Sequence, residues 1–313
     1  LRLILSPSVG GTAGYLYDAV AALASSGGEA VLIVPEQYSF AAERIVLERL
    51  GTADAQRVEV LSFTRLANTV FNSVGWDKGK RLNEAGKILL MSRALEQCAD
   101  KLTVYARSAD SPAVVRELLV LSEEFCQCAI SSEDIVSAMN NMEEGLLKDK
   151  LGDISLVFSV YDSFVSDGWL DDSRMLTRLK DKLAESGYFK NKTVFFDSFR
   201  GFTAQEFGVI GKILTQADDV CVALNAPDLT DVGSDDIFYH TKNTAKKLIK
   251  IANSVDVPCA KPVTVNEPNS DAALDALAKD FLSPEADVFE GECGSIAVVA
   301  APDIRSECAF IAA

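Results

Sequence analysis

Residues that could hold a nucleotide follow the first apolar run of the chain. The segment from Ser6 to Ala13 stands where a phosphate-binding loop, G-x-x-x-x-G-K-[ST], would lie between a strand and a helix. In that motif the backbone amides hold the phosphates, the lysine reaches the β- and γ-phosphates, and the hydroxyl binds Mg²⁺. Gly11 matches and Gly10 precedes it, but Thr12 replaces the lysine and Ala13 replaces the hydroxyl residue. We predict a degenerate nucleotide loop without ATP hydrolysis, in which residual nucleotide binding stays open.

A second candidate for this chemistry is a carboxylate at the end of a later apolar run. Asp197 follows Thr193–Phe196 as a metal-binding aspartate follows its strand in nucleotide hydrolases. A helicase-type site would place a glutamate next, and Ser198 cannot orient water in its place. Asp197 alone could hold a metal ion, but Thr12 and Ala13 offer no matching ligand. The sequence predicts no metal site, no cofactor and no catalytic residue in this segment, and the loop and strand could survive only as scaffold.

The charge balance restricts the kind of partner. The chain has 30 Lys and Arg against 46 Asp and Glu, a net charge of −16 over 313 residues. Nucleic-acid-binding domains are usually basic, so a contact with DNA needs a local patch or a partner protein that supplies positive potential. The sequence has no run of about 18 apolar residues and no signal-peptide pattern. We expect a cytoplasmic protein with no membrane contact.

The cysteines give no metal-binding pattern. The seven cysteines include no C-x-x-C pair, and the chain has a single histidine, His240. A tetrahedral zinc site is therefore not predicted, and reduced thiols are expected. His240 is interpreted as an ordinary surface or half-buried residue.

Apolar runs that alternate with helical periodicity predict an α/β fold with a parallel sheet. The predicted strands are 1–5, 30–34, 58–61, 193–196, 220–224 and 295–300, and the predicted helices beside them are 14–26, 64–71, 204–214, 243–252 and 271–281. From 82 to 185 only helical periodicity occurs. We therefore divide the chain into a first α/β part (1–75), a helical insertion (76–190) and a second α/β part (191–313). A final helix from Asp303 has no stop signal, which indicates a segment of a longer protein.

Three stretches of the chain resemble a known family. They read Val-Pro-Glu-Gln-Tyr-Ser-Phe at 34–40, Leu-Ser-Phe-Thr-Arg-Leu-Ala at 61–67 and Phe-Asp-Ser-Phe-Arg-Gly-Phe-Thr-Ala-Gln-Glu-Phe at 196–207. Their order and spacing resemble the N-terminal helicase-like region of the B subunit of the ATP-dependent helicase/deoxyribonuclease (AddB, or RexB in some lineages). The resemblance covers essentially the whole chain. It implies a P-loop NTPase fold, in which a RecA-like sheet of the superfamily-1 helicase domain 1A type is interrupted by a 1B-like helical insertion.

The same resemblance implies a role in DNA repair. Members of the AddB family form a bacterial heterodimer with an AddA-type helicase–nuclease and act in double-strand break repair by homologous recombination. AddB proteins are implied to bind the 3′-ended single-stranded DNA and to contribute to recognition of the hotspot Chi. ATP and Mg²⁺ are implied at the motor of the partner, and the nuclease site and iron–sulfur cluster in a C-terminal region beyond this chain. The segment is thus expected to be an inactivated helicase-like domain.

Carried over position by position, the resemblance assigns residues to the DNA strand. The implied DNA-binding positions are Gln37, Ser39, Phe63, Arg65, Asn68 and Phe202. Aromatic rings stack on bases, glutamine can read adenine, and arginine can read guanine or a phosphate. Ser39 replaces a common threonine, and Asn68 stands where relatives often have tryptophan. The loss of that stacking platform implies a different hotspot or weaker recognition.

Each assignment has a plainer structural alternative. Phe63 and Phe202 could be core residues, and Arg65 a surface cation. Gln37 and Ser39 could be helix-start residues after Pro35, with Ser39 as the N-cap of a helix at 40–50. The lysines at 242, 246, 247 and 250 are interpreted as a solvated basic face, with a phosphate contact as the second choice. For the whole chain, the alternatives to strand binding are a P-loop nucleotide-binding enzyme and an acidic structural scaffold for the AddA-type partner.

Overall fold

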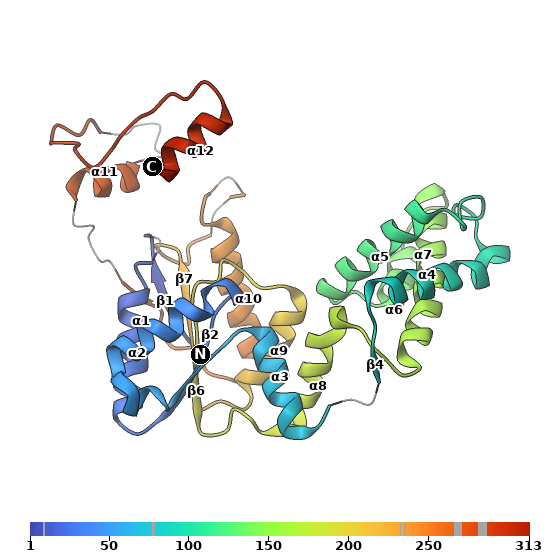
Figure 1. The fold of residues 1–313 in the computed structure, drawn as a ribbon, viewed down its shortest axis with the longest axis horizontal. Helices are drawn as coiled ribbons and strands as arrows, with labels where there is room; N and C mark the ends of the chain where they lie inside the picture. Colours follow the sequence, from blue (N-terminus) through green and yellow to red (C-terminus); the bar gives the residue numbers. More distant parts are fainter. Residues whose placement is uncertain (9, 77–78, 232, 235, 266–270, 281–286) are drawn as a thin grey trace.

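A parallel sheet forms the body of the protein in a computed structural model of the chain (Figure 1). The structure describes residues 1–8, 10–76, 79–231, 233–234, 236–265, 271–280 and 287–313. Six strands lie in the order β3-β2-β6-β7-β1-β8, and their described pairings are parallel. The strands are β1 (Arg2–Ser6), β2 (Glu29–Ile33), β3 (Val58–Leu61), β6 (Lys192–Phe196), β7 (Asp219–Asn225) and β8 (Val263–Thr264). The predicted α/β class is confirmed, whereas the RecA-like assignment stays a prediction.

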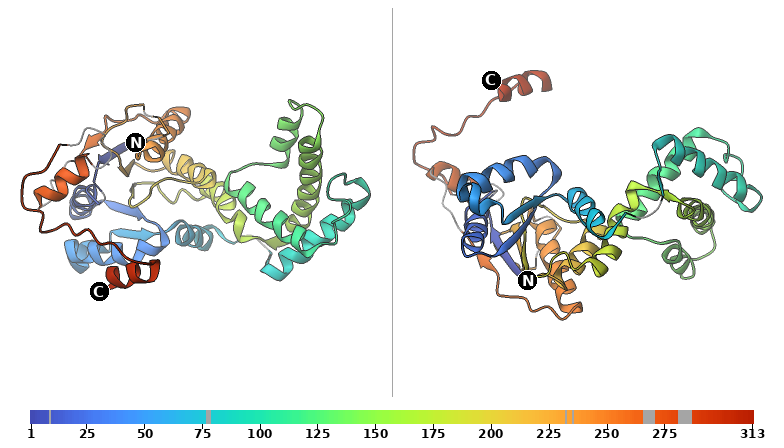
Figure 2. Two further views of the ribbon diagram at one scale, coloured as in Figure 1. Left: turned by 90° about the horizontal axis from the view of Figure 1, so that it is seen from above. Right: turned by 60° about the horizontal axis from the view of Figure 1, so that its bottom comes forward.

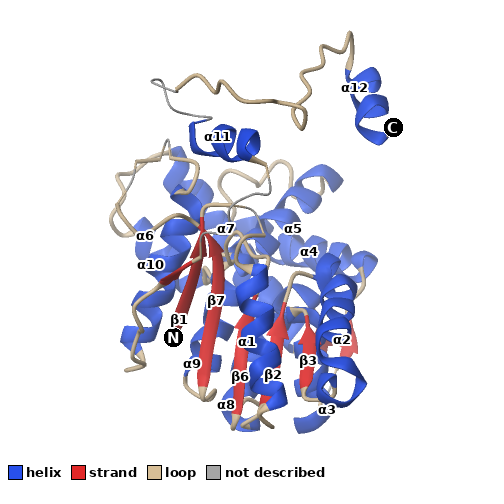
Figure 3. Cartoon of the chain, turned by 90° about the vertical axis from the view of Figure 1, so that its left-hand side faces the viewer, coloured by secondary structure: helices blue, strands red, loops and turns tan. Residues whose placement is uncertain are grey.

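Helices cover both faces of this sheet (Figure 3). One face carries α1 (Ala13–Ser25) and α2 (Ser39–Ala55). The other carries α3 (Phe63–Val74), α8 (Met175–Ser186), α9 (Ala204–Leu214) and α10 (Tyr239–Ser254). In β2, Leu32 packs with the first layer and Ile33 with the second, because successive side chains of a strand point to opposite faces. The near-continuous apolar runs of the sequence follow from this double cover.

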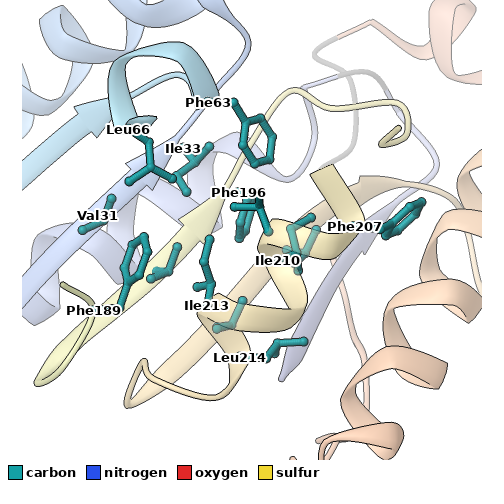
Figure 4. Packing of buried hydrophobic residues seen from close by; sticks show 14 of the residues in the cluster. Val31, Ile33, Phe63, Leu66, Phe189, Phe196, Phe207, Ile210, Ile213 and Leu214 are labelled. Atoms are coloured by element: carbon teal, nitrogen blue, oxygen red, sulfur yellow. The ribbon is translucent and has the colours of Figure 1, made fainter. Parts of the chain in front are cut away.

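The core on the α3 and α9 side is built from aromatic and branched residues (Figure 4). Phe189 and Phe196 are fully buried there, together with Leu66 and Ile213. Burying a side chain of this size contributes about 1.5–3 kcal/mol to stability. This core fixes α3 and α9 against the sheet, and both helices begin beside the candidate site.

The two helices begin at caps that the sequence encodes. Ser62 Oγ accepts a hydrogen bond from the Arg65 amide at 3.2 Å, which satisfies one of the free amides of the first turn of α3. Thr203 and Glu206 form a reciprocal capping box at the start of α9. The predicted helix 204–214 is therefore found with the predicted bounds.

The helical insertion has a core of its own and extends away from the sheet (Figure 2). It contains α4 (Glu84–Cys98), α5 (Pro112–Gln127), α6 (Ser132–Met139) and α7 (Leu146–Ser166), with short 3-10 turns at Ala99–Lys101 and Asp172–Arg174. A two-stranded pair, β4 (Lys80–Arg81) and β5 (Trp169–Leu170), joins its two connections to the body. α8 falls within the range predicted as insertion, yet its Leu179 and Leu183 pack in the core of the body.

The strand predicted at 295–300 is wrong. These residues are irregular, and Val298 is 96% exposed. An apolar run forms a strand only beside a neighbour that accepts its backbone hydrogen bonds, and the place next to β1 is taken by β8, which the sequence did not predict. Helices α11 (Ala272–Asp280) and α12 (Ile304–Ala312) lie near their predicted positions, although Phe281 is outside the described residues. Within the described ranges, no helix has the length and apolar character needed to cross a bilayer.

Candidate functional site at the carboxyl edge of the sheet

The carboxyl ends of the parallel strands meet at one edge of the sheet, and every predicted site residue follows one of these ends. Gly10, Gly11, Thr12 and Ala13 follow β1; Gln37 and Ser39 follow β2; Phe63, Arg65 and Asn68 follow β3; Asp197 and Phe202 follow β6. Open α/β sheets bind ligands in the crevice at this edge. We call the loop 6–13 with Asp197 and Asn225 the nucleotide half, and the segments 36–40, 62–68 and 198–203 the open half.

The loop of the nucleotide half is folded on itself. The Gly11 amide donates to the Ser8 carbonyl at 3.1 Å, and the hydroxyls of Ser6 and Ser8 lie 3.1 Å apart. A Cβ on Gly11 would lie 2.3 Å from Ser6 Oγ and 2.4 Å from Ser8 Oγ. Gly10 has a φ of 77°, a left-handed conformation that glycine adopts without strain. The presence of glycine at both positions is therefore explained by packing and backbone conformation, without a bound phosphate. Val9, between Ser8 and Gly10, lies outside the described residues.

The two residues at the lysine and hydroxyl positions of the phosphate-loop motif do not present a charged group to a phosphate. Thr12 is buried directly before α1, and Ala13 is the first residue of that helix. The Asn225 side chain lies against the loop. With its amide nitrogen turned toward the loop, it donates to the carbonyls of Ser6 and Pro7 at 2.7 and 3.1 Å. Asn225, at the end of β7, thus provides hydrogen-bond donors for carbonyls of the loop. The two motif positions, Thr12 and Ala13, carry no positive charge.

Asp197 is a buried carboxylate in the nucleotide half, with 7% of its surface exposed. Its amide donates to the Ile33 carbonyl at 3.1 Å, and Ser198 Oγ donates to Asp197 Oδ2 at 3.2 Å. Burial raises the pKa of the Asp197 carboxyl, because the charged form loses its hydration. A carboxyl group shifted toward its neutral form is a poorer metal ligand. Among the described residues, no three His, Cys, Asp or Glu side chains are grouped so that they could hold a metal ion.

The segment after β2 presents polar and aromatic side chains to solvent. Pro35 begins a 3-10 turn, η1 (Glu36–Tyr38), in which Gln37 and Tyr38 are exposed. Ser39 is buried, and its hydroxyl has no hydrogen-bond partner among the described residues. The alternative in which Ser39 caps a helix is wrong, because η1 runs directly into α2 and makes Ser39 the first residue of that helix.

Arg65 and Asn68 lie in the first two turns of α3. The Arg65 guanidinium is about half exposed and pairs with Glu43 Oε1 at 2.6 Å. An exposed ion pair contributes only about 0–1 kcal/mol, so Arg65 can exchange this carboxylate for a phosphate or a base at little cost. Asn68 is half-buried. Ser62 donates a hydrogen bond to Glu36, which ties the start of α3 to η1.

Phenylalanine rings connect the loop after β6 to the start of α3. The Phe63 ring centroid lies 6.2 Å from that of Phe196, 5.8 Å from Phe199 and 6.4 Å from Phe202. The rings of Phe199 and Phe202 are 4.8 Å apart. Phe63 is only 7% exposed, so its ring holds this cluster together and offers little free face. Phe202 is half-buried and keeps part of its ring at the surface.

Sequence reasoning missed two exposed aromatics of the open half. Tyr38 is about half exposed, and Phe40 is 78% exposed on the first turn of α2. Both stand in the stretch 34–40 that carries the resemblance, next to Gln37. Aromatic residues that flank polar ones after a strand end were the available signal, because they do not fit the spacing of a buried helix face.

The predicted basic face of α10 is smaller than expected. Lys242 is 3% exposed, and its Nζ lies 3.0 Å from Asp228 Oδ1. Hydrogen bonds from Thr230 and Lys242 lower the pKa of Asp228 to about 2. Lys242 points inward because it shares a helical stripe with the buried Ala245. The lysines of this helix that reach solvent are therefore those at 246, 247 and 250.

Comparisons with known proteins place the chain in a family. A family model described as ADDB, N-terminal, matches residues 3–278. A protein of Caldanaerobacter subterraneus subsp. tengcongensis, named as the B subunit of an ATP-dependent helicase/deoxyribonuclease, is 30% identical over 290 residues, which cover 90% of this chain and 25% of that protein. Proteins of the same name from Ruminiclostridium cellulolyticum and Clostridium botulinum (strain Loch Maree / Type A3) are 35% and 33% identical over 78% and 75% of this chain, and over 22% and 21% of their own length.

The fold and the edge define an α/β protein that carries a helical insertion and gathers its candidate site at the carboxyl ends of its strands. The chain belongs to the AddB N-terminal family, as the three sequence stretches predicted. It spans about a quarter of the length of the curated relatives that it matches.

Proposed function

We propose that this chain is the N-terminal part of the AddB subunit of a bacterial AddAB-type helicase–nuclease, and that its open half binds the 3′-ended single strand. The names of the relatives support the assignment to such a complex. The observation that carries strand binding is the open half itself. Gln37, Arg65 and Phe202, from three different strand ends, supply an amide, a cation and a partly exposed ring on one edge.

The chemistry of these side chains suits an unpaired polynucleotide. Stacking of a base on an aromatic ring contributes about 1–3 kcal/mol, and a cation beside it neutralises the backbone. Tyr38 and Phe40 add exposed rings beside Gln37. In this proposal they compensate for the absence of an aromatic residue at Asn68, and the hotspot that is read differs accordingly.

The nucleotide half is proposed to have no catalytic role. Its loop bonds to itself, and its carboxylate is buried, so that ATP and Mg²⁺ would act at the motor of an AddA-type partner. The partner would also supply the positive potential that a chain with a net charge of −16 lacks. In this role the chain serves double-strand break repair by homologous recombination in the cytoplasm, as a contributor to Chi-type hotspot recognition.

The test is strand binding by the full-length AddB-type protein assembled with its AddA-type partner. Arg65→Ala removes the cation, and Phe202→Ala removes the ring. We expect each to weaken binding of a 3′-tailed oligonucleotide by about tenfold, which corresponds to the removal of about one charged or stacking interaction. Fluorescence anisotropy at a fixed salt concentration measures the affinity.

Matched controls use residues of the same kind outside the edge. Arg44, which pairs with Glu48 one turn along α2, is the control for Arg65. Phe125, a half-buried ring that packs on Phe158 in the insertion, is the control for Phe202. Both controls should bind as the unaltered protein does. Unchanged affinity in both Arg65→Ala and Phe202→Ala would remove the proposed site and favour the acidic scaffold.

A further inference from the structure

A hollow of about 620 Å³ lies between the loop after β6 and α10, next to the open half. In the ribbon, α9 and α10 lie next to each other beside this loop (Figure 1). The residues that line the hollow are Arg200, Gly201, Phe202, Phe207, Tyr239, His240, Asn243, Thr244, Lys246, Lys247 and Lys250. We call it the α10 groove. It shares Arg200, Gly201 and Phe202 with the open half and is therefore continuous with it.

The charge of the α10 groove is opposite to that of the protein. Its lining contains Arg200 and three lysines but no aspartate or glutamate, in a chain with a net charge of −16. Asp231, which pairs with Lys246, is not part of the lining and is almost fully exposed. Such an exposed pair is easily exchanged for another anion. A basic hollow on an acidic protein is a local site for a polyanion.

Aromatic rings form part of the same surface. The Phe202 and Phe207 rings lie 5.5 Å apart, and Lys247 Nζ lies 5.6 Å from the Phe207 centroid. Gly201 lets the loop approach α10 closely, since a Cβ there would lie 3.2 Å from Thr244 Oγ1. Phe207 is only 9% exposed and offers little free face, so the half-buried Phe202 supplies the ring on which a base can stack while the lysines follow the backbone.

We propose that the α10 groove binds the phosphodiester backbone of single-stranded DNA where the strand continues past Phe202. The proposal rests on the positive charge of the groove lining, on the partly exposed ring of Phe202 and on the continuity of the groove with the open half. Lys246, Lys247 and Lys250 contact phosphates, and the ring of Phe202 marks the point where base contacts and backbone contacts meet. This inference rests on the proposed function, since it extends the path of the same strand.

The experiment measures the salt dependence of strand binding by the full-length AddB-type protein in complex with its partner. The variant K246A/K247A/K250A removes the cations of the groove. The matched control K101A/K150A/K190A removes three exposed lysines that do not line it. Each phosphate that is no longer neutralised should flatten the plot of log affinity against log salt by about 0.7 for a single strand. We expect the slope to fall by about 2 in the groove variant and to stay unchanged in the control.

Three outcomes distinguish strand binding in the α10 groove from strand binding at the open half alone and from anion binding elsewhere. If the groove variant keeps the slope of the unaltered protein while Arg65→Ala weakens binding, the α10 groove is excluded and the proposed function stands. Inorganic tripolyphosphate serves as a competitor of the oligonucleotide. If it competes equally well with the unaltered protein and with the groove variant, the groove is not the anion site and the inference is wrong. A slope reduced only in the groove variant, with competition abolished in the same variant, supports it.

Discussion

The nucleotide half and the open half of the carboxyl edge follow strands of one parallel sheet but present different surfaces. In the nucleotide half, Gly11 packs against two serine hydroxyls and Asp197 is buried. In the open half, Gln37 and Phe40 are exposed, and the Arg65 side chain forms an exposed ion pair with Glu43. The same backbone frame thus supports a loop closed on itself and a surface of available side chains.

The two halves differ in what their side chains can contact. Where the phosphate-loop motif has a lysine and a hydroxyl residue, this chain has Thr12 and Ala13, which supply no positive charge for a phosphate. The strands behind the loop carry the core. In the segments after β2 and β3, exposed side chains such as Gln37 and Arg65 contribute little to folding, whereas Phe63 belongs to the core.

The largest expected effect concerns Phe63, which belongs to the open half by sequence but to the core by packing. Phe63→Ala should destabilise the protein by about 3–5 kcal/mol, because it leaves a cavity beside Phe196 and Phe199. Phe40→Ala is the matched control, and its 78% exposed ring should cost less than about 0.5 kcal/mol. Urea unfolding measures both. Equal stabilities of the two variants would contradict the distinction between core and open residues.

The next effect tests how tightly the loop of the nucleotide half packs on itself. Gly11→Ala places a methyl group within 2.3 Å of Ser6 Oγ, so we expect a loss of about 1–3 kcal/mol in the free energy of unfolding. Gly145→Ala, at an exposed position where a Cβ meets no atom within 4 Å, is the control. If Gly11→Ala is as stable as Gly145→Ala, the loop is open enough to receive a ligand.

A smaller effect depends on pH through Asp197. Its pKa in the folded protein is raised above the ordinary value of 3.8 by burial, so the folded state binds the proton more tightly than the unfolded state. The stability from this protonation is complete below the ordinary pKa and is lost as the pH rises through the folded pKa. Asp197→Asn should therefore be more stable than the unaltered protein at pH 7, with a difference that shrinks toward pH 4. Thermal unfolding at several pH values decides this, and a destabilised Asn variant at pH 7 would indicate an ion pair or a bound cation at Asp197.

The smallest expected effect on stability is that of Arg65→Ala. Because its pair with Glu43 is exposed, the free energy of unfolding should change by less than about 0.5 kcal/mol. The same variant is expected to bind the strand about tenfold more weakly, so the two measurements separate binding from folding. A decrease in stability above about 1 kcal/mol would mean that Arg65 is structural and that its effect on binding is indirect.

Much of the fold could be predicted from the chain, since strands with apolar runs and helices with encoded caps are local patterns. The strands at β3 and β6 and the whole of α9 agree with prediction within a residue. The strand at 295–300 failed because a strand depends on a partner elsewhere in the chain. β8 was missed for the converse reason: two residues that pair beside β1 leave no periodic signal.

The candidate site was predictable only in part. The family stretches led to Gln37, Arg65 and Phe202, all at the carboxyl edge, and to Phe63, which is largely buried there. Lys242 could have been placed correctly from its spacing to Ala245, yet the carboxylate that satisfies it, Asp228, precedes the helix and is brought close only by folding.

By itself, the sequence determined most of the strands and helices, though not β8, and determined that the first loop lacks the lysine and the final hydroxyl residue of the phosphate-binding motif, because propensity, capping and side-chain type are local properties. The tertiary structure decided which residues of the carboxyl edge are open, that Lys242 is buried, and that the loop after β6 and α10 enclose a basic groove. These are properties of burial and juxtaposition, and they depend on segments that are far apart along the chain and meet only when the sheet is formed.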